Sequence, residues 1–433
     1  MKTKTYTFVK TSLIVFFLMI GLSAQLFAID FTEKKKKDKQ DIDLTTFNVY
    51  KGKLKDANSN DPLVFATIAV EGENTATISN IEGEFILKIN KKSKAKNIII
   101  THLGYENLSY KISNLSPDKN VIKLEPAVLT LGEVTVYPDS PEVLIRMLLD
   151  KVSENYGNKA YNMTGFYRES IKKRNRYVAL SEAVVNIYKS SYTGLSNDQV
   201  QIYKGRKGTD IRRLDTLLFK LQGGPATTML LDVIKNPTVI LDKDLIEYYD
   251  FAIINMIKIG SRLNYVIEFN QKEGLDFPLY NGKYYVDIEN LALTAADFSL
   301  NINNPVLASR LFLRKKPIGA KVTPTNAHYT VKYRQQDGEW FFNYAKGEVE
   351  FKVNWDKRLF NTNFTIMSEL AITDRKDENI ERFKNKNRFK RREILSEKID
   401  AFADENYWGE YNLIEPDQAI EVAIRRIKRL LKK

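Results

Sequence analysis

The sequence predicts a mainly β protein: an N-terminal antiparallel β-sandwich followed by an α+β domain with a curved antiparallel sheet and C-terminal helices. Between residues 47 and 137, short segments that alternate apolar and polar side chains follow one another without a helical segment between them. This pattern is typical of two packed antiparallel sheets. Beyond residue 160 the alternating segments are longer and rich in aromatic residues, which predicts a meander of long strands. The change of pattern places the domain boundary at Pro138, so the sandwich takes residues 47–138 and the second domain residues 139–433.

The first residues have the pattern of a secretory signal peptide. A lysine-bearing flank precedes an apolar run over residues 13–22, and the small residues Ser23, Ala24 and Ala28 follow. A permanent membrane anchor is the alternative, but a spanning helix needs roughly 20 apolar residues, and this run is shorter. We therefore expect residues 1–28 to be a signal peptide and the mature chain to contain no transmembrane helix. The protein is then exported, to the periplasm or to the outer membrane of a Gram-negative envelope.

The overall composition excludes several classes of site. Residues 29–46 are polar, include four consecutive lysines and lack apolar periodicity, so we expect a disordered spacer. The chain has no cysteine, which excludes disulfides, thiolate metal sites, a cysteine nucleophile and a lipid-bearing cysteine. The net charge is +13, but Lys and Arg are interleaved with acids along most of the chain. We therefore expect no nucleic-acid partner, and a basic surface that attracts anionic lipid or lipopolysaccharide instead.

The predicted sandwich centres on a tight turn before residue 84. The segment Gly83–Ile89 alternates as a half-buried strand does, and Ser79-Asn80-Ile81-Glu82-Gly83 has turn chemistry, since glycine accepts positive φ and Asn or Ser side chains bond neighbouring amides. The other strands of this domain are expected at residues 47–54, 62–71, 97–105, 108–113, 121–124 and 133–137.

A set of short motifs within this domain resembles the carboxypeptidase regulatory-like domain. The motifs are Leu54-x-Asp56 before Pro62-Leu63, Ala66-Thr67-Ile68-x-Val70, Gly83-x-Phe85, Leu103-Gly104-Tyr105 and Leu131-Gly132-Glu133-Val134-Thr135-Val136. The resemblance implies a prealbumin-like, non-catalytic sandwich, similar to the periplasmic N-termini of TonB-dependent receptors from Bacteroidetes. It marks six residues as the signature of the fold: Pro62, Ala66, Gly83, Phe85, Gly104 and Tyr105. The sequence has Asn80 where the family more often has Asp, which argues against a metal-dependent role of the turn.

The second domain is expected to open with a helix and continue with strands. Ser140, Pro141 and Glu142 are typical of a helix start, with the serine as cap, and apolar residues then recur at helical spacing until about Gly157. Asp337-Gly338 separates two alternating segments and predicts a tight hairpin. A short helix is expected at 227–234, and strands at 164–170, 177–188, 248–254, 265–270, 284–289, 295–301, 329–334, 340–344, 348–355 and 363–373.

The end of the chain is expected to be helical and charged. Residues 384–398 mix apolar side chains with many Lys and Arg, and residues 419–431 form one apolar stripe at helical spacing. This last helix could pack on the sheet or dock on a membrane surface. Packing is favoured, because amphipathic helices of globular proteins commonly show the same apolar stripe. The segment Tyr284–Leu293 resembles the curved antiparallel sheets of outer-membrane lipoprotein carriers. Residues 140–433 are similar in layout to uncharacterised exported Bacteroidetes proteins.

Catalytic motifs were sought because the family name suggests a peptidase. A zinc site needs converging donors, but the only histidines, His102 and His328, have no partners at metal-binding spacing, so we expect both to be structural or surface residues. The sequence contains no Gly-x-Ser-x-Gly elbow and no phosphate-binding loop. A pair of catalytic carboxylates remains open, because 54 acidic residues leave the choice undetermined. We predict no catalytic, cofactor-binding or metal-binding residue.

These observations lead to a functional hypothesis. The protein is expected to be a non-catalytic exported envelope protein that binds or scaffolds at the periplasmic side of the outer membrane, with a glycan, a lipid or an envelope protein as ligand. The alternative is a hydrolase of envelope polysaccharide or peptide that uses a carboxylate pair. The aromatic runs Tyr248-Tyr249, Tyr284-Tyr285 and Trp340-Phe341-Phe342 suit a ligand groove or the core. A full TonB-dependent receptor is not expected, because a barrel of 22 strands of roughly ten residues each exceeds the second domain.

Overall fold

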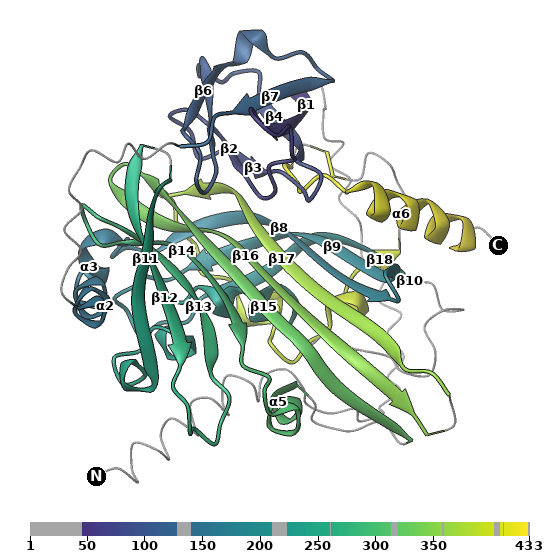
Figure 1. The fold of residues 1–433 in the computed structure, drawn as a ribbon. Coiled ribbons are helices and arrows are strands. Elements are labelled where there is room, and N and C mark those ends of the chain that lie inside the picture. The colour runs from purple at the N-terminus through teal and green to yellow at the C-terminus, as the bar shows by residue number, and fades with distance from the viewer. Residues whose placement is uncertain are drawn as a thin grey trace.

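The computed structural model describes residues 46–127, 140–209, 223–259, 261–312, 319–356, 359–401, 408–409 and 411–431. The predicted signal peptide, the spacer up to residue 45, the strand at 133–137 and the boundary at Pro138 lie outside these residues. The described part consists of a small sandwich seated against one face of a large curved sheet (Figure 1). The predicted mainly β fold class is confirmed.

The sandwich contains a three-stranded sheet in the order β4-β1-β7 and a four-stranded sheet in the order β3-β2-β5-β6. The prediction of two purely antiparallel sheets is wrong in one place, because β1 and β7 pair in parallel. The chain crosses from β6 in the other sheet through residues 112–119 before it enters β7. The strands are β1 (Phe47–Asp56), β2 (Thr67–Val70), β3 (Ala76–Ile78), β4 (Glu84–Asn90), β5 (Asn97–Thr101), β6 (Leu108–Lys111) and β7 (Asn120–Leu124).

The turn before β4 is held by a side-chain amide. Asn80 Oδ1 accepts hydrogen bonds from the backbone N–H groups of Glu82 and Glu84, both at 2.9 Å. Gly83 has φ 76° and its carbonyl accepts a hydrogen bond from Leu54 N at 2.8 Å. The neutral Asn80 therefore makes the hydrogen bonds that the turn requires.

The six signature residues gather around this turn and the adjoining strands. Ala66 and Phe85 are fully buried, and Pro62 forms a β-bridge with Lys55. Tyr105 donates a hydrogen bond from its hydroxyl to Asp56 Oδ2 at 2.6 Å. Gly104, at φ 79°, donates its N–H to the carbonyl of Lys258 in the second domain at 3.1 Å. The signature therefore builds the sandwich and one of its contacts with the second domain.

The large sheet has eleven strands in the order β11-β12-β13-β14-β15-β16-β17-β8-β9-β10-β18. All pairs are antiparallel except β10 with the two-residue β18. The predicted hairpin at Asp337-Gly338 joins the two longest strands. The bounds are β8 (Tyr161–Lys173), β9 (Arg176–Lys189), β10 (Gln199–Thr209), β11 (Tyr249–Ile259), β12 (Arg262–Gln271), β13 (Tyr280–Asp287), β14 (Leu293–Leu300), β15 (Ala320–Gln336), β16 (Glu339–Trp355), β17 (Thr362–Lys376) and β18 (Asp400–Ala401).

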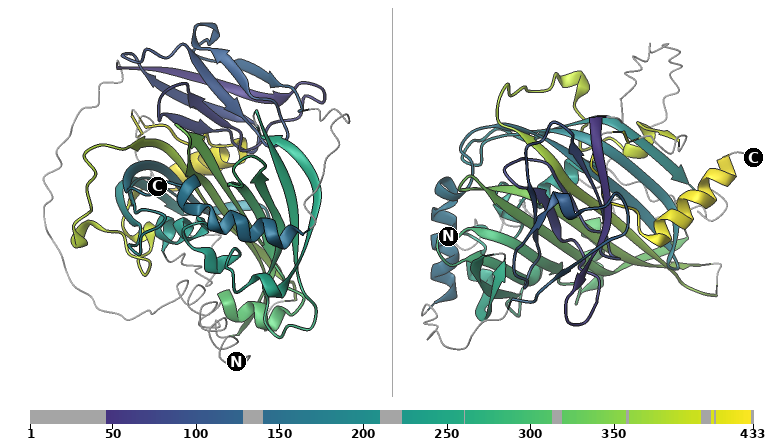
Figure 2. Two further views of the ribbon diagram at one scale, coloured as in Figure 1. Left: turned by 90° about the vertical axis from the view of Figure 1, so that its left-hand side faces the viewer. Right: turned by 90° about the horizontal axis from the view of Figure 1, so that it is seen from above.

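Helices and turns surround this sheet (Figure 2). The predicted helix start at Ser140 is confirmed, but α2 ends at Asp150, and the Ser140 hydroxyl bonds Glu142 Oε2 at 2.6 Å and caps no N–H. The predicted helix at 227–234 is α4 with a 3-10 turn. The bounds are α2 (Pro141–Asp150), α3 (Val152–Asn155), α4 (Gly224–Thr228), α5 (Pro305–Phe312) and α6 (Gln418–Leu431), with 3-10 turns at Ile112–Asn114, Met229–Leu231, Pro237–Val239, Ile246–Tyr248, Asn385–Asn387 and Leu395–Glu397.

The predicted helix at 384–398 is wrong. This segment contains only two 3-10 turns and runs along the sheet edge, where Phe389 N donates to the carbonyl of Val200 at 2.7 Å. Phe389 and Leu395 enter the core six residues apart, a spacing that does not put both on one face of a helix. Contacts with distant strands have therefore overridden the local helical preference.

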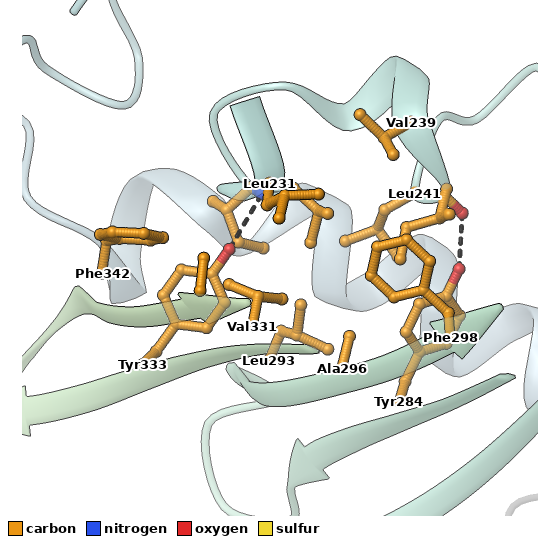
Figure 3. Close-up of a cluster of buried hydrophobic side chains, with 14 of the residues drawn as sticks. Leu231, Val239, Leu241, Tyr284, Leu293, Ala296, Phe298, Val331, Tyr333 and Phe342 are labelled. Atoms are coloured by element: carbon orange, nitrogen blue, oxygen red, sulfur yellow. Dashed lines mark hydrogen bonds between the residues drawn. The ribbon is translucent and has the colours of Figure 1, made fainter. Parts of the chain in front are cut away.

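One face of the large sheet, the inner face, is covered by α2 and by residues 229–248. Figure 3 shows two tyrosines of the sheet that reach into this cover. Tyr333 Oη accepts a hydrogen bond from Ile234 N at 3.2 Å, and Tyr284 Oη donates one to the carbonyl of Ile240 at 2.5 Å. Tyr284, Tyr249, Trp340, Phe341 and Phe342 are all buried, so the predicted aromatic runs serve mainly as core.

The other face of the sheet, the outer face, carries the sandwich and a C-terminal strap of residues 408, 409 and 411–417. Several hydrogen bonds join the strap to the sandwich. Leu413 O accepts from Thr77 Oγ1 at 3.0 Å, Glu415 O accepts from Asn80 Nδ2 at 3.2 Å, and Asn412 Oδ1 accepts from Lys88 N at 2.7 Å. An apolar cluster unites the three parts, made of Ile78, Ile86, Phe166, Val184, Tyr344, Ala371, Trp408, Leu413 and Ile414.

A buried arginine fastens the strap to the sheet. The Arg168 guanidinium, 1% exposed, lies 2.8 Å from Glu182 and 3.3 Å from Glu369, and it donates to the carbonyl of Ile414 at 2.7 Å. Arg206 binds the second oxygen of Glu182 at 2.8 Å. Burial disfavours the charged carboxylate, but the two guanidinium groups outweigh it and lower the pKa of Glu182. At Glu369 burial outweighs Arg168 and raises the pKa. The cluster is therefore a buried, hydrogen-bonded clamp that holds the strap.

We expect Gly83→Ala to destabilise the protein more than Gly72→Ala. Both glycines have positive φ, 76° and 72°, so both variants carry a similar backbone strain. A Cβ at Gly83 would lie 2.5 Å from the carbonyl oxygen of Leu54, whereas nothing lies within 4 Å at Gly72. In urea unfolding, the free energy of unfolding should fall by about 3 kcal/mol for the first variant and about 1 kcal/mol for the second. Equal losses of unfolding free energy in the two variants would contradict the close approach of position 83 to the Leu54 carbonyl.

Acid should destabilise the protein through His102, which lies between the sandwich and the sheet. Burial and repulsion from Lys332 lower its pKa from 6.5 to about 4, although carbonyl oxygens face both ring nitrogens. Between these values the unfolded chain binds the proton and the folded chain does not, so stability falls as the pH falls from 6.5 to 4. The free energy of unfolding is measured in urea at pH 7 and at pH 4 for both proteins. Between these two pH values, His102→Asn should lose about 3 kcal/mol less of it than the parent chain. An equal loss in both proteins would rule this out.

Candidate anion-binding cleft

A cavity lies at one edge of the second domain. Its volume is about 900 Å³. Three segments that are far apart in the sequence form its walls: the turn at 190–198 between β9 and β10, the residues around 226–236, and the irregular segment 382–392. No described residue of the sandwich lines this cleft.

Basic side chains dominate the described lining of the cleft. It includes six basic residues and one acid, Asp198, whose carboxylate is already paired with Lys189. The positive charge of the cleft is thus not neutralised by acids in its own lining. The six basic residues are Lys235, Arg382, Arg388, Lys390, Arg391 and Arg392.

Contacts with neighbouring backbone hold several of these side chains in place. Arg382 donates from Nε to the Tyr188 hydroxyl at 3.0 Å and lies over that ring, and Arg388 donates from Nε to the carbonyl of Phe383 at 2.8 Å. Lys235 donates from Nζ to the carbonyl of Gly194 at 2.7 Å. The basic wall is therefore largely preformed, which lowers the entropic cost of ligand binding.

A buried ion network lies beside the cleft. Lys189 Nζ is 2.6 Å from Asp198 Oδ2 and 2.8 Å from Asp232 Oδ2, and neither Lys189 nor Asp232 is exposed. The hydroxyls of Tyr192 and Tyr333 donate to Asp232 at 3.0 and 2.8 Å. Asp198 Oδ1 accepts from the N–H and the hydroxyl of Ser190 at 2.9 and 3.0 Å, so every oxygen of the two carboxylates has a partner and the turn at 190–198 is fixed to the core.

The pKa shifts in the buried Lys189 network differ from those in the cleft. Burial disfavours the Lys189 cation, but Asp198 and Asp232 outweigh it and raise its pKa. In the cleft, burial and then repulsion from Lys189 lower the pKa of Lys235, and burial lowers the pKa of Arg391. The network beneath contains one cation and two carboxylates, whereas the described lining of the cleft has six basic side chains and only one of these carboxylates, Asp198.

The two carboxylates beside the cleft already have a cationic partner. Asp198 and Asp232 are both occupied by Lys189, so neither is a ready general base. Among the residues that the structure describes, no group of three or more His, Asp or Glu side chains is placed to hold a metal ion. Clustered Arg and Lys side chains with preformed geometry recognise anions, phosphate above all.

The residues singled out by sequence lie elsewhere. None of the six signature residues lines the cleft. His102 contacts the carbonyls of Val64 and Leu103, and His328 lies on β15 near Ser299 and Asp297. The buried carboxylates Glu182 and Glu369 share Arg168 beneath the strap, and neither lines the basic cleft.

Sequence analysis missed the cleft, although part of its signal was present. The segment 382–392 holds seven Lys or Arg residues and two phenylalanines, and it was interpreted as a charged helix. A basic run interrupted by aromatic residues is also the pattern of an anion-binding segment. Nothing in the sequence indicated that the turn at 190–198 would lie opposite it.

Comparison with known proteins identifies part of the chain. Residues 50–136 match the family described as the CarboxypepD_reg-like domain, which confirms the domain inferred from the motifs. No curated protein matches the chain. Within the described residues no helix is long and apolar enough to cross a membrane.

Solved structures show only distant similarity. A DUF1329 family protein from Desulfovibrio piger is 12% identical, with 56% of this chain and 96% of that chain covered and a TM-score of 0.22. Lipovitellin, from a structure on lipid-protein interactions, is 9% identical, with 58% of this chain and 28% of that chain covered and a TM-score of 0.26. A 9R-lipoxygenase from Cyanothece is 9% identical, with 47% of this chain and 49% of that chain covered and a TM-score of 0.15.

Lys189→Met should strongly destabilise the protein, because it leaves Asp232 buried without a counterion. The expected loss in the free energy of unfolding is about 3–5 kcal/mol. Lys243→Met is the matched control, because Lys243 pairs with Asp150 at the surface, with both side chains more than half exposed, and its loss should stay within about 1 kcal/mol. Chemical unfolding of both variants tests this, and similar losses would show that the buried network contributes little.

Proposed function

We propose that this protein is a non-catalytic, exported binding protein of the Bacteroidetes envelope whose second domain binds a phosphate-bearing glycan or lipid headgroup in the basic cleft. The observation that carries the proposal is the convergence of six basic side chains on one cavity whose only described carboxylate is paired with Lys189. Work at the periplasmic side of the outer membrane is part of the same proposal.

Electrostatics supports an anionic ligand. Like charges gathered on one cavity repel each other, and an anion placed among them relieves that repulsion. One cation about 4 Å from an anion contributes about 4 kcal/mol at the effective dielectric constant near a protein surface, before desolvation is subtracted. Several such contacts suffice for a specific site. Arg is also the side chain best suited to bidentate contacts with phosphate oxygens.

The rest of the chain is consistent with this role. The N-terminal pattern predicts export, and the net charge of +13 has the sign that steers anionic ligands toward the protein. The sandwich is bonded to the outer face through the strap, and none of its described residues lines the cleft. We infer that the sandwich serves as a scaffold and the second domain as the ligand-binding part.

Calorimetric titration with a sugar phosphate at low salt tests the proposal. Glucose 6-phosphate should bind the parent chain, and glucose should not. The double variant Arg388→Gln/Arg392→Gln removes two cleft charges and should weaken binding of the phosphate by about tenfold or more. Binding should also weaken as salt is raised, because screening acts on exposed charges.

The matched control is Lys91→Gln/Lys92→Gln, which removes two charges from an exposed turn of the sandwich. This variant should bind glucose 6-phosphate as the parent does, and both double variants should keep the parent's unfolding midpoint. Equal weakening by the two double variants would show that net charge alone acts. Equal binding of glucose and its phosphate would refute an anion site.

A further inference from the structure

Two large apolar side chains are exposed at the end of a long hairpin. The turn between β16 and β17, strands of 17 and 15 residues, carries Leu359 and Phe360. They are 97% and 75% exposed. In Figure 1 the free ends of these two strands lie at the lower right, far from the sandwich. Single exposed apolar residues are common, but two adjacent ones at a projecting turn mark a contact surface.

Basic residues flank this turn on the neighbouring hairpin. Arg174 N donates to the carbonyl of Asn363 at 3.0 Å, which places the β8–β9 turn beside the start of β17. The sequence there is Lys172-Lys173-Arg174-Asn175-Arg176, four cations without an acid. Arg174 and Arg176 are exposed. The exposed apolar pair thus lies next to a strongly cationic turn.

Helix α6 adds further cations on the outer face. Its apolar side packs through Ile420 and Ala423 on Tyr177 and Leu180 of β9, which confirms that this helix packs on the sheet. Arg426 bonds the carbonyl of Tyr177, directly after the cationic turn. The same helix exposes Arg425 and Arg429. Acids are also present here: Glu421 lies 4.0 Å from Arg425, Asp417 directly precedes α6 and lies near Tyr177, and Glu348 and Glu350 are on β16. Among the described residues of the two turns and α6, basic side chains outnumber acids.

We propose that this end of the molecule, formed by Leu359 and Phe360, the β8–β9 turn, and Arg425 and Arg429 of α6, docks on an anionic lipid bilayer. Leu359 and Phe360 enter the interface between headgroups and acyl chains, and the surrounding cations contact lipid phosphates. Each Lys or Arg held close to an anionic bilayer strengthens binding about fivefold. The docking tip, as we call these three elements, shares no residue with the cleft and does not depend on the function proposed above.

Charge complementarity favours a bilayer over a second copy of this chain. Two identical tips would bring the same cations together, and the repulsion would oppose the apolar contact. A bilayer containing anionic lipid supplies both the negative charge and the apolar layer.

A position-specific fluorophore tests the insertion directly. The full chain has no cysteine, so Phe360→Cys carries the only label when coupled to an environment-sensitive dye. Vesicles of phosphatidylethanolamine with phosphatidylglycerol should shift its emission to the blue, and phosphatidylcholine vesicles should do so much less. Val121→Cys, at a half-exposed site on β7 of the sandwich, is the control and should not respond. No shift at position 360, or the same shift at both positions, would overturn the proposal.

Substitutions test the two components separately by vesicle sedimentation. Leu359→Ser/Phe360→Ser should weaken binding to anionic vesicles by about tenfold or more. Arg174→Glu/Arg176→Glu should weaken it similarly and reduce its salt dependence, whereas Lys111→Glu/Lys123→Glu on exposed strand positions of the sandwich should have a much smaller effect. Unchanged vesicle binding in the first variant overturns the proposal. A second outcome would also overturn it. If Leu359→Ser/Phe360→Ser and the parent chain differ in sedimentation coefficient without vesicles, the tip is a self-association surface.

Discussion

The arrangement of the two domains depends on one buried cation. Arg168 lies within the large sheet, binds Glu182 and Glu369 on neighbouring strands, and uses its remaining donor for the carbonyl of Ile414. The strap held in this way presents its backbone to the sandwich, and the sandwich meets the sheet through an apolar cluster that includes strap residues. A buried guanidinium must have all its partners or lose several kcal/mol, so it tolerates one position of the strap and few alternatives. Apolar contacts alone would allow the sandwich to slide.

The two faces of the sheet explain where a ligand has room. Residues 229–248 fill the inner face, and tyrosine hydroxyls from the sheet satisfy backbone groups of that cover. The outer face is filled by the sandwich and the strap. The charged cleft therefore forms at an edge, where the turn at 190–198 and segment 382–392 meet over the Lys189 network. The basic side chains of the cleft are not part of the hydrophobic core. Packing of the core therefore does not explain why they gather there.

Local pattern was sufficient to predict most strands, but it did not predict contacts between distant segments. The alternation from Gly83 to Ile89, the Asp337-Gly338 hairpin and the stripe of α6 each depend on neighbours in the sequence, and each is present. The parallel pairing of β1 with β7 and the irregular path of residues 384–398 depend on partners elsewhere in the chain. The cleft combines segments nearly two hundred residues apart, so composition could suggest a basic surface but not its place.

The position of the strap has a consequence for the order of assembly. A chain that emerges N-terminus first completes its sandwich long before residues 408–417 exist, since domains fold as units during synthesis or export. Until then Ile78 and Ile86, which the finished protein hides against Leu413 and Ile414, remain without their cover. The earliest domain to fold is thus the last to be seated.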